Sequence, residues 1–201
     1  MSIYLKVQAV ERIFSQLEKD VSSFQKSTGL GCIANCGKCC YKTDINATAL
    51  EFLPLAYHLF KNGEAEIWLE RLNNDHSTTL CPVLATILAP NAKGSCSKYA
   101  HRGLICRLFG FSAMLHKNDR PTLVTCRPIK EGIPEAVSKA EEHINSKKDY
   151  PLISNYYMQM RSVDESLGEE LFPIRQAIAK AINHVLGYYA YRRPPKGTIV
   201  A

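Results

Sequence analysis

The sequence has no long apolar run, no internal repeat and no low-complexity tract. A membrane-spanning helix needs roughly 20 consecutive apolar residues, and no stretch approaches that length, so we expect no membrane span. Residues 1–12 mix charged with apolar side chains and lack the apolar core and small-residue cleavage site of a signal peptide. These absences together predict a cytoplasmic protein.

The short motifs that mark many enzyme active sites are absent as well. There is no Gly-x-Ser-x-Gly nucleophile turn, no Walker phosphate loop, no dinucleotide-binding glycine pattern and no His-Glu-x-x-His zinc motif. No nucleotide cofactor is therefore expected. A cysteine nucleophile paired with His101 is the one metal-free catalytic arrangement that the residues suggest, and the abundance of thiols favours metal ligation over it.

The overall composition is that of a folded globular chain. Hydrophobic residues make up 46% and charged residues 22%, which excludes a disordered or collagen-like protein. The length of 201 residues suits a single domain over 1–201. The net charge is +6, but the basic residues are dispersed, apart from Arg192 and Arg193 in a tail over 191–201, so we do not expect a nucleic-acid partner.

Helical signals dominate and strand signals are few, which predicts a mainly α, helical domain with at most a few short strands. Apolar residues recur every three or four positions over 3–24, and Gly29 can supply a left-handed cap. Thr48-Ala49-Leu50-Glu51 has the spacing of a capping box and opens a helix that stops at Asn62-Gly63. Further helices are expected over 64–72, 134–144 and 151–163, and strands over 122–125 and 108–112.

The two ends of the chain carry comparable apolar stripes. The N-terminal helix, 1–29, has a spacing that also suits a coiled-coil dimer. A second stripe runs over 171–189, with Pro173 in its first turn or at a kink of a longer helix that begins with a capping box at 166–169. We expect the C-terminal helices of 134–190 to pack on the N-terminal helix, with dimerisation through that helix as the alternative.

Cysteine is the residue type in marked excess. All eight copies lie between residues 31 and 127, a loop-rich cysteine-cluster core, and both flanks have none. A content of about 4% is lower than in disulfide-rich secreted chains and fits a metal site better. The candidate metal ligands are Cys32, Cys36, Cys39, Cys40, Cys81, Cys96, Cys106 and Cys126.

The first four cysteines are closely spaced, as Cys-x3-Cys-x2-Cys-Cys. Two residues between Cys36 and Cys39 let a turn bring both sulfurs to one point, and Gly37 can take the conformation that this turn needs. Adjacent side chains diverge, so Cys39 and Cys40 do not readily bind one ion together. Either they serve two neighbouring metal positions, or one is a ligand and the other packs in the core.

The four later cysteines are single, and two of them are followed directly by an arginine, Arg107 or Arg127. Cations beside a cysteine favour its thiolate and offset the negative charge of a cysteine-ligated centre; the alternative for each arginine is a solvated loop position. His101 is a further candidate ligand, whereas His58 is expected on a helix surface. Tyr99 either bonds a ligating sulfur or, as we prefer, packs in the core.

Three motifs occur together: Cys36-Gly37-Lys38-Cys39-Cys40, then Cys81-Pro82-x-Leu84, then Cys96-x-x-Tyr99-x-x-Arg102 followed by Cys106-Arg107-x-Phe109. This combination resembles the bacterial YkgJ-like cysteine-cluster (CxxCxxCC) family, described as zinc- or iron-chelating. The resemblance covers about 31–111. The chain departs from the family in having three residues between Cys32 and Cys36, and in having Arg102-Gly103 where Arg-Pro is usual, which suggests a looser local turn.

The resemblance implies a metal centre, and the family is often labelled iron–sulfur. Single cysteines joined to a compact group suit an iron–sulfur cluster, [4Fe-4S] in the first instance, slightly better than zinc, whose structural sites commonly use two pairs. Flagellin lysine methylases carry a similar cysteine pattern, so S-adenosylmethionine-dependent modification is an analogy only. The spacing of radical S-adenosylmethionine enzymes also matches, but the helical chain and Lys38 argue against that class.

Two functions from different classes follow. In the first, the metal centre is chemically active, in redox transfer or in modifying another protein, and one thiolate position is open or replaceable. In the second, the centre is a structural staple of a helical protein-interaction module. A protein partner or protein substrate is expected in either case.

Overall fold

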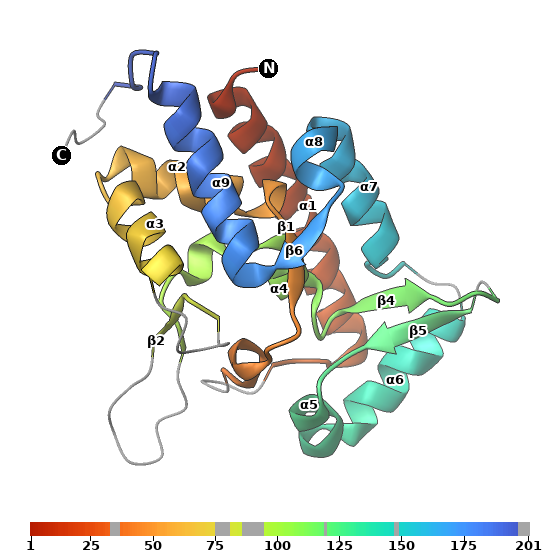
Figure 1. Ribbon diagram of the computed structural model, residues 1–201. Coiled ribbons are helices and arrows are strands. Elements are labelled where there is room, and N and C mark those ends of the chain that lie inside the picture. The colour runs from red at the N-terminus through yellow and green to blue at the C-terminus, as the bar shows by residue number, and fades with distance from the viewer. Residues whose placement is uncertain (33–36, 75–80, 86–94, 119, 147–148, 197–201) are drawn as a thin grey trace.

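The computed structural model describes residues 1–32, 37–74, 81–85, 95–118, 120–146 and 149–196. In this part of the chain helices predominate, and the strands form three antiparallel pairs (Figure 1). The mainly α fold expected from the helical periodicity is confirmed. Among the described helices, none combines the length and the apolar character that crossing a membrane requires.

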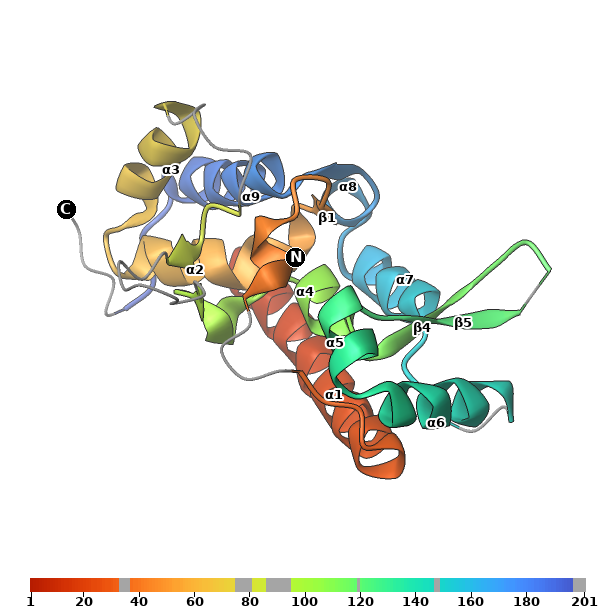
Figure 2. The same cartoon turned by 90° about the horizontal axis from the view of Figure 1, so that it is seen from below.

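The longest of the described helices, α1 (Ile3–Thr28), carries the apolar stripe expected from the sequence. The Ser2 hydroxyl caps its start by accepting from the Leu5 N–H, and Gly29 ends it at φ 75°, a left-handed conformation that glycine adopts without strain. The stripe is buried, and α1 crosses the molecule from α2 toward α6 (Figure 2). Its neighbours are α2 (Leu53–Lys61), α4 (Leu104–Leu108), α6 (Pro134–Asn145) and α7 (Ile153–Val163).

The C-terminal helix α9 (Ile174–Tyr189) packs mainly on α2 and on α3 (Ala65–Asn74). Since α2 also contacts α1, the two terminal helices contribute to one core through α2, while α6 and α7 lie directly on α1. The apolar surface of α1 is therefore covered by helices of its own chain.

The start of α9 differs from the sequence interpretation in two places. Leu171, assigned to the helical stripe, is exposed in the strand β6 (Leu171–Pro173), which pairs with β1 (Asn46–Thr48). A proline disfavours helical backbone in the residue before it, so the helix begins only after Pro173. The box at 166–169 does not open α9 either, because Asp164 caps the separate helix α8 (Glu165–Gly168) by accepting from the Leu167 N–H.

The capping box at Thr48 and Glu51 is confirmed, and its carboxylate does more than cap. Glu51 accepts from the Thr48 N–H at 2.7 Å, at the entry to the 3-10 turn η2 (Leu50–Phe52) and α2. Its second oxygen accepts from the Ile105 N–H at 2.8 Å, at the start of α4, and the Tyr157 side chain of α7 also hydrogen-bonds to this carboxylate. One fully buried carboxylate thus joins three distant parts of the chain.

Gly103 lies directly against this carboxylate. A Cβ atom at this position would stand 2.7 Å from the Phe52 ring and 2.9 Å from Glu51 Oε2. The looser turn expected from Arg102-Gly103 is therefore wrong, because the missing side chain makes room for a close approach of α4 to η2.

A hairpin of β4 (Ser112–Leu115) and β5 (Pro121–Val124) projects from the helices (Figure 1). It confirms the strand expected at 122–125, but the strand expected at 108–112 is displaced, because Leu108 ends α4 and Gly110, at φ 99°, turns the chain before β4. The hairpin base, α6 and α5 (Arg127–Gly132) surround a second, smaller core.

The Glu51 carboxyl predicts a specific pH dependence of stability. Burial outweighs its hydrogen bonds and raises its pKa from 4.5 to about 7. A carboxyl whose pKa is raised by folding stabilises the fold fully below pH 4.5, and that contribution is lost as the pH rises to about 7. At 1.36 kcal/mol per pKa unit, the loss has an upper limit of about 3 kcal/mol.

Glu51→Gln should therefore lower the free energy of unfolding at pH 5 by about 1–3 kcal/mol, because an amide nitrogen cannot accept from a backbone N–H. It should also flatten the decline between pH 4.5 and 7. Urea unfolding of both proteins across this range measures the two effects, and the difference between the curves cancels other titrating groups. Parallel curves would contradict the expectation.

Candidate metal centre

Five cysteine side chains from four separate segments come together beside the main core. Their pKa values are coupled through hydrogen bonds and electrostatic interactions, which places their sulfurs close to one another. Three of them also pack partly buried against the main core, and a fourth is part of it. This thiol cluster consists of Cys39, Cys40, Cys81, Cys96 and Cys106.

The first segment is the short 3-10 turn η1 (Lys38–Tyr41), which carries two of the thiols. Gly37 precedes it at φ 57°, the conformation expected of this glycine, and the Cys40 N–H donates to the Gly37 carbonyl at 2.9 Å. The adjacent side chains do not diverge: the Cys39 thiol donates a hydrogen bond to Cys40, which donates in turn to Cys81. Both adjacent cysteines therefore belong to the same group.

Backbone hydrogen bonds hold the second and third segments next to the first. The Cys81 N–H donates to the Cys40 carbonyl at 3.2 Å, and a turn leads to β2 (Leu84–Ala85). In the antiparallel pair with β3 (Ser95–Cys96), Leu84 stands opposite Cys96, and the Ser97 N–H and hydroxyl both donate to the Val83 carbonyl at 2.9 Å. This small ladder brings Cys81 and Cys96 to one side of η1.

Burial and mutual proximity disfavour the charged form of these thiols. The hydrogen bond to Cys40 raises the pKa of Cys39. The bond with Cys39 lowers the pKa of Cys40, but the bond to Cys81 together with burial outweighs it and raises that pKa to about 12. Burial, the Glu51 carboxylate and the other thiols raise the pKa of Cys106 to about 12. Burial also raises the pKa of Cys96, against the effect of Arg102.

The chemistry of this donor set fits zinc or iron. Soft thiolates select these metals over magnesium or calcium, and a cation placed among the thiols would compensate the repulsion that raises their pKa values, with release of protons. Within the described ranges, no three Cys, His, Asp or Glu side chains already stand in a metal-coordinating arrangement. The fit is thus one of donor type and proximity.

Three predicted ligands are not among these five cysteines. Cys36 is not among the described residues. Cys32 is exposed, four residues beyond the end of α1. Cys126 precedes α5 and packs, partly buried, against the second core instead of the main one.

The two arginines that follow cysteines have different surroundings. Arg127 is exposed and pairs with Glu131 one helical turn away, so the solvated alternative holds for it. Arg107 is buried and binds backbone carbonyls and Glu18. Tyr99 takes neither expected role: it is 63% exposed, with the Arg102 guanidinium 3.5 Å from its ring centroid.

His101 stacks on His58 of α2, with ring centroids 4.2 Å apart. Burial is the main cause that lowers the pKa of both imidazoles, and nearby Lys98 lowers them further. His58 is therefore half-buried, contrary to the surface position expected from the sequence. The stack connects α2 with the turn η3 (Tyr99–His101), which lies between Cys96 and Cys106.

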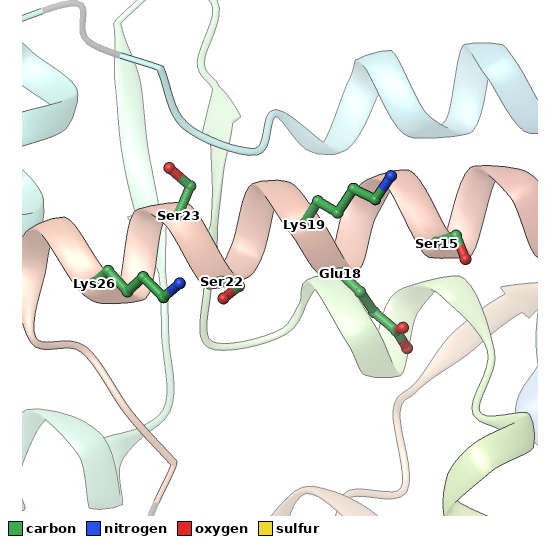
Figure 3. A pocket seen from close by; sticks show the side chains of 6 residues that line it. All are labelled: Ser15, Glu18, Lys19, Ser22, Ser23 and Lys26. Carbon is green, nitrogen blue, oxygen red and sulfur yellow. The ribbon is translucent and has the colours of Figure 1, made fainter.

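An open groove of about 530 Å³ is lined by side chains of α1 (Figure 3). The residues that line it are polar or charged and include no cysteine: Ser15, Glu18, Lys19, Ser22, Ser23 and Lys26. The groove is therefore distinct from the thiol cluster.

The comparison with known families agrees with this picture. The model of the CxxCxxCC family, described as a putative zinc- or iron-chelating domain, matches residues 31–132, just over half of the chain. The chain belongs to the CxxCxxCC family. The resemblance to the CxxCxxCC family inferred from the cysteine motifs is confirmed, and the family supports a metal-binding role. No curated protein and no solved structure matches the chain.

Sequence reasoning missed Glu51, Arg107 and His58 as residues that organise the site. Glu51 binds an N–H 54 positions away, and Arg107 reaches Glu18 across 89 positions. No local spacing signals contacts of this range. One feature of the sequence indicates that Arg107 is buried: it directly follows Cys106 in the family motif.

The central position of Cys40 predicts how metal content responds to substitution. Cys40→Ser should lower the zinc or iron retained per chain to less than half, because Cys40 bonds to thiols on both sides. Cys126→Ser, the matched control from the second core, should retain the wild-type amount. Elemental analysis after anaerobic reconstitution measures both, and equal losses in the two variants would place Cys126 in the same centre.

Proposed function

We propose that this chain is a metal-binding protein in which the thiolates of the thiol cluster hold a zinc ion or an iron–sulfur centre. The observation that carries the proposal is the convergence of five thiols from four segments within the CxxCxxCC region. Sulfurs that raise one another's pKa values gain most from a shared cation. A reducing compartment such as the cytoplasm would keep these thiols available.

The distribution of the thiols along the chain favours the iron–sulfur form. Structural zinc sites commonly use two close pairs of cysteines, whereas this cluster joins one adjacent pair to three single cysteines from distant segments. A bound iron–sulfur centre would supply electron transfer, whereas zinc would supply a fixed, charge-compensated link between segments.

The position of the cluster favours a structural role for the centre. Cys81 is part of the main core, and Cys40, Cys96 and Cys106 pack against it. A metal bound there would tie η1 and the two short strands β2 and β3 to α4. Such a staple suits a helical module that binds a protein partner.

One observation favours a chemically active centre instead. Cys39 is exposed, while Cys81 is buried, so the cluster reaches the protein surface at one end. An accessible thiolate is the position at which a redox partner or a protein substrate would approach. This second function requires a metal that changes oxidation state or an open coordination position.

Anaerobic purification with elemental analysis and absorption spectroscopy tests the identity of the metal. We expect a brown protein whose visible absorption is bleached by dithionite. A colourless protein with stoichiometric zinc would support a structural role for the metal and contradict a redox function. A chain that takes up neither metal after reconstitution would overturn the proposed function.

Removal of the metal tests the staple. Chelation should lower the thermal midpoint clearly, because binding energy at a site absent from the unfolded chain is folding energy. The control is Cys40→Ser with the same chelator, whose midpoint should change little. Equal midpoints for wild-type protein with and without metal would contradict a structural role.

A further inference from the structure

Arg107 is a fully charged side chain that is only 8% exposed. Its Nε donates to the Arg102 carbonyl at 3.0 Å, and its Nη2 donates to the Ala100 carbonyl at 2.7 Å. Its Nη1 forms an ion pair with Glu18 of α1, and its guanidinium carbon lies 4.5 Å from the Phe14 ring centroid. Each nitrogen of the guanidinium thus has a partner of its own.

The two carbonyls belong to the turn that separates two thiols of the cluster. Ala100 is in η3, and Arg102 is its C-terminal cap, between Cys96 and Cys106. Arg107 follows Cys106 directly. Its side chain therefore folds back over the loop that leads from one proposed ligand to the next and fastens this loop to α1.

Lysine could not make this set of contacts. A guanidinium presents N–H groups in a rigid planar fork, whereas an ammonium is a compact point charge. The geometry uses that fork, with two nitrogens on the turn and the third on Glu18.

We propose that Arg107 is a positioning residue of the metal centre, which fixes the separation of Cys96 and Cys106 by fastening their connecting turn to α1. This inference rests on the proposed function. It assigns Arg107 a geometric role in place of the charge compensation expected of an arginine beside a cysteine. Two further contacts support the same loop: the stack of His101 on His58, and the acceptance of the Ile105 N–H by Glu51.

Arg127 provides a matched control. It also follows a cysteine directly, but it is exposed and pairs with Glu131 of the same helix. Arg107→Lys and Arg127→Lys therefore make the same chemical change next to a cysteine, with and without loss of the buried contacts.

Zinc affinity, measured anaerobically by competition with a chromophoric chelator, tests the proposal. Arg107→Lys should bind zinc about 10- to 100-fold more weakly, the range typical for residues that orient metal ligands. Arg127→Lys should match the wild type. The visible spectrum of the cobalt-substituted protein should change in Arg107→Lys and stay the same in Arg127→Lys, because it reports the geometry of the thiolates.

A purely structural role would give a different result. In that case Arg107→Lys would lower the thermal midpoint equally with and without metal and leave zinc affinity and the cobalt spectrum unchanged, which would overturn the inference. If Arg107→Lys does not fold, Glu18→Ala provides the test, since it keeps the guanidinium fork and removes the acceptor on α1; wild-type affinity in that variant would also overturn the inference. Failure of the wild-type chain to bind any metal is distinguishable, because it refutes the proposed function itself.

Discussion

The structure depends on the cost of placing five sulfurs side by side at the edge of an apolar core. Thiols tolerate such a setting while they carry protons, and they do so by hydrogen-bonding in series from Cys39 to Cys40 to Cys81. Thiolates do not, unless a cation lies between them. With the proposed function, the arrangement would have two stable conditions, one protonated and one metal-bound, and the change from the first to the second would release protons.

The surrounding scaffold keeps this costly group in place with a few buried polar contacts. The secondary structure that carries the thiols is short: a 3-10 turn, two strands of two residues and a helix of five. Elements of this size have little stability of their own. Glu51 and Arg107 compensate by binding backbone groups of the loop around Cys106: Glu51, in η2, accepts from the Ile105 N–H, and Arg107, in α4 itself, donates to the Arg102 carbonyl and pairs with Glu18 of α1.

Local signals in the sequence were sufficient for the scaffold. The alternating stripe of α1, its Gly29 cap and the Thr48–Glu51 box each depend on residues within one or two turns, and all three appear as expected. Errors arose where tertiary contacts decide. Leu171 is not part of the buried helical stripe, because β6 pairs with β1. Gly103 is closely packed, because Phe52 and Glu51 lie against it. The grouping of Cys39, Cys40, Cys81, Cys96 and Cys106 needs the folded chain, since spacing alone ranks Cys126 equally with them.

The five cysteines are far apart in the sequence, so all of them would be present for a metal only after much of the chain has been synthesised. The cysteines of the cluster extend from Cys39 to Cys106 in the sequence, and the segment between Cys40 and Cys81 contains both α2 and α3. A nascent polypeptide that has left the ribosome only as far as α3 holds just two of the five donors. Metal binding by all five thiols would therefore require the chain to be synthesised beyond residue 106, and the closure of so long a loop would confine the unfolded ensemble of the loaded chain.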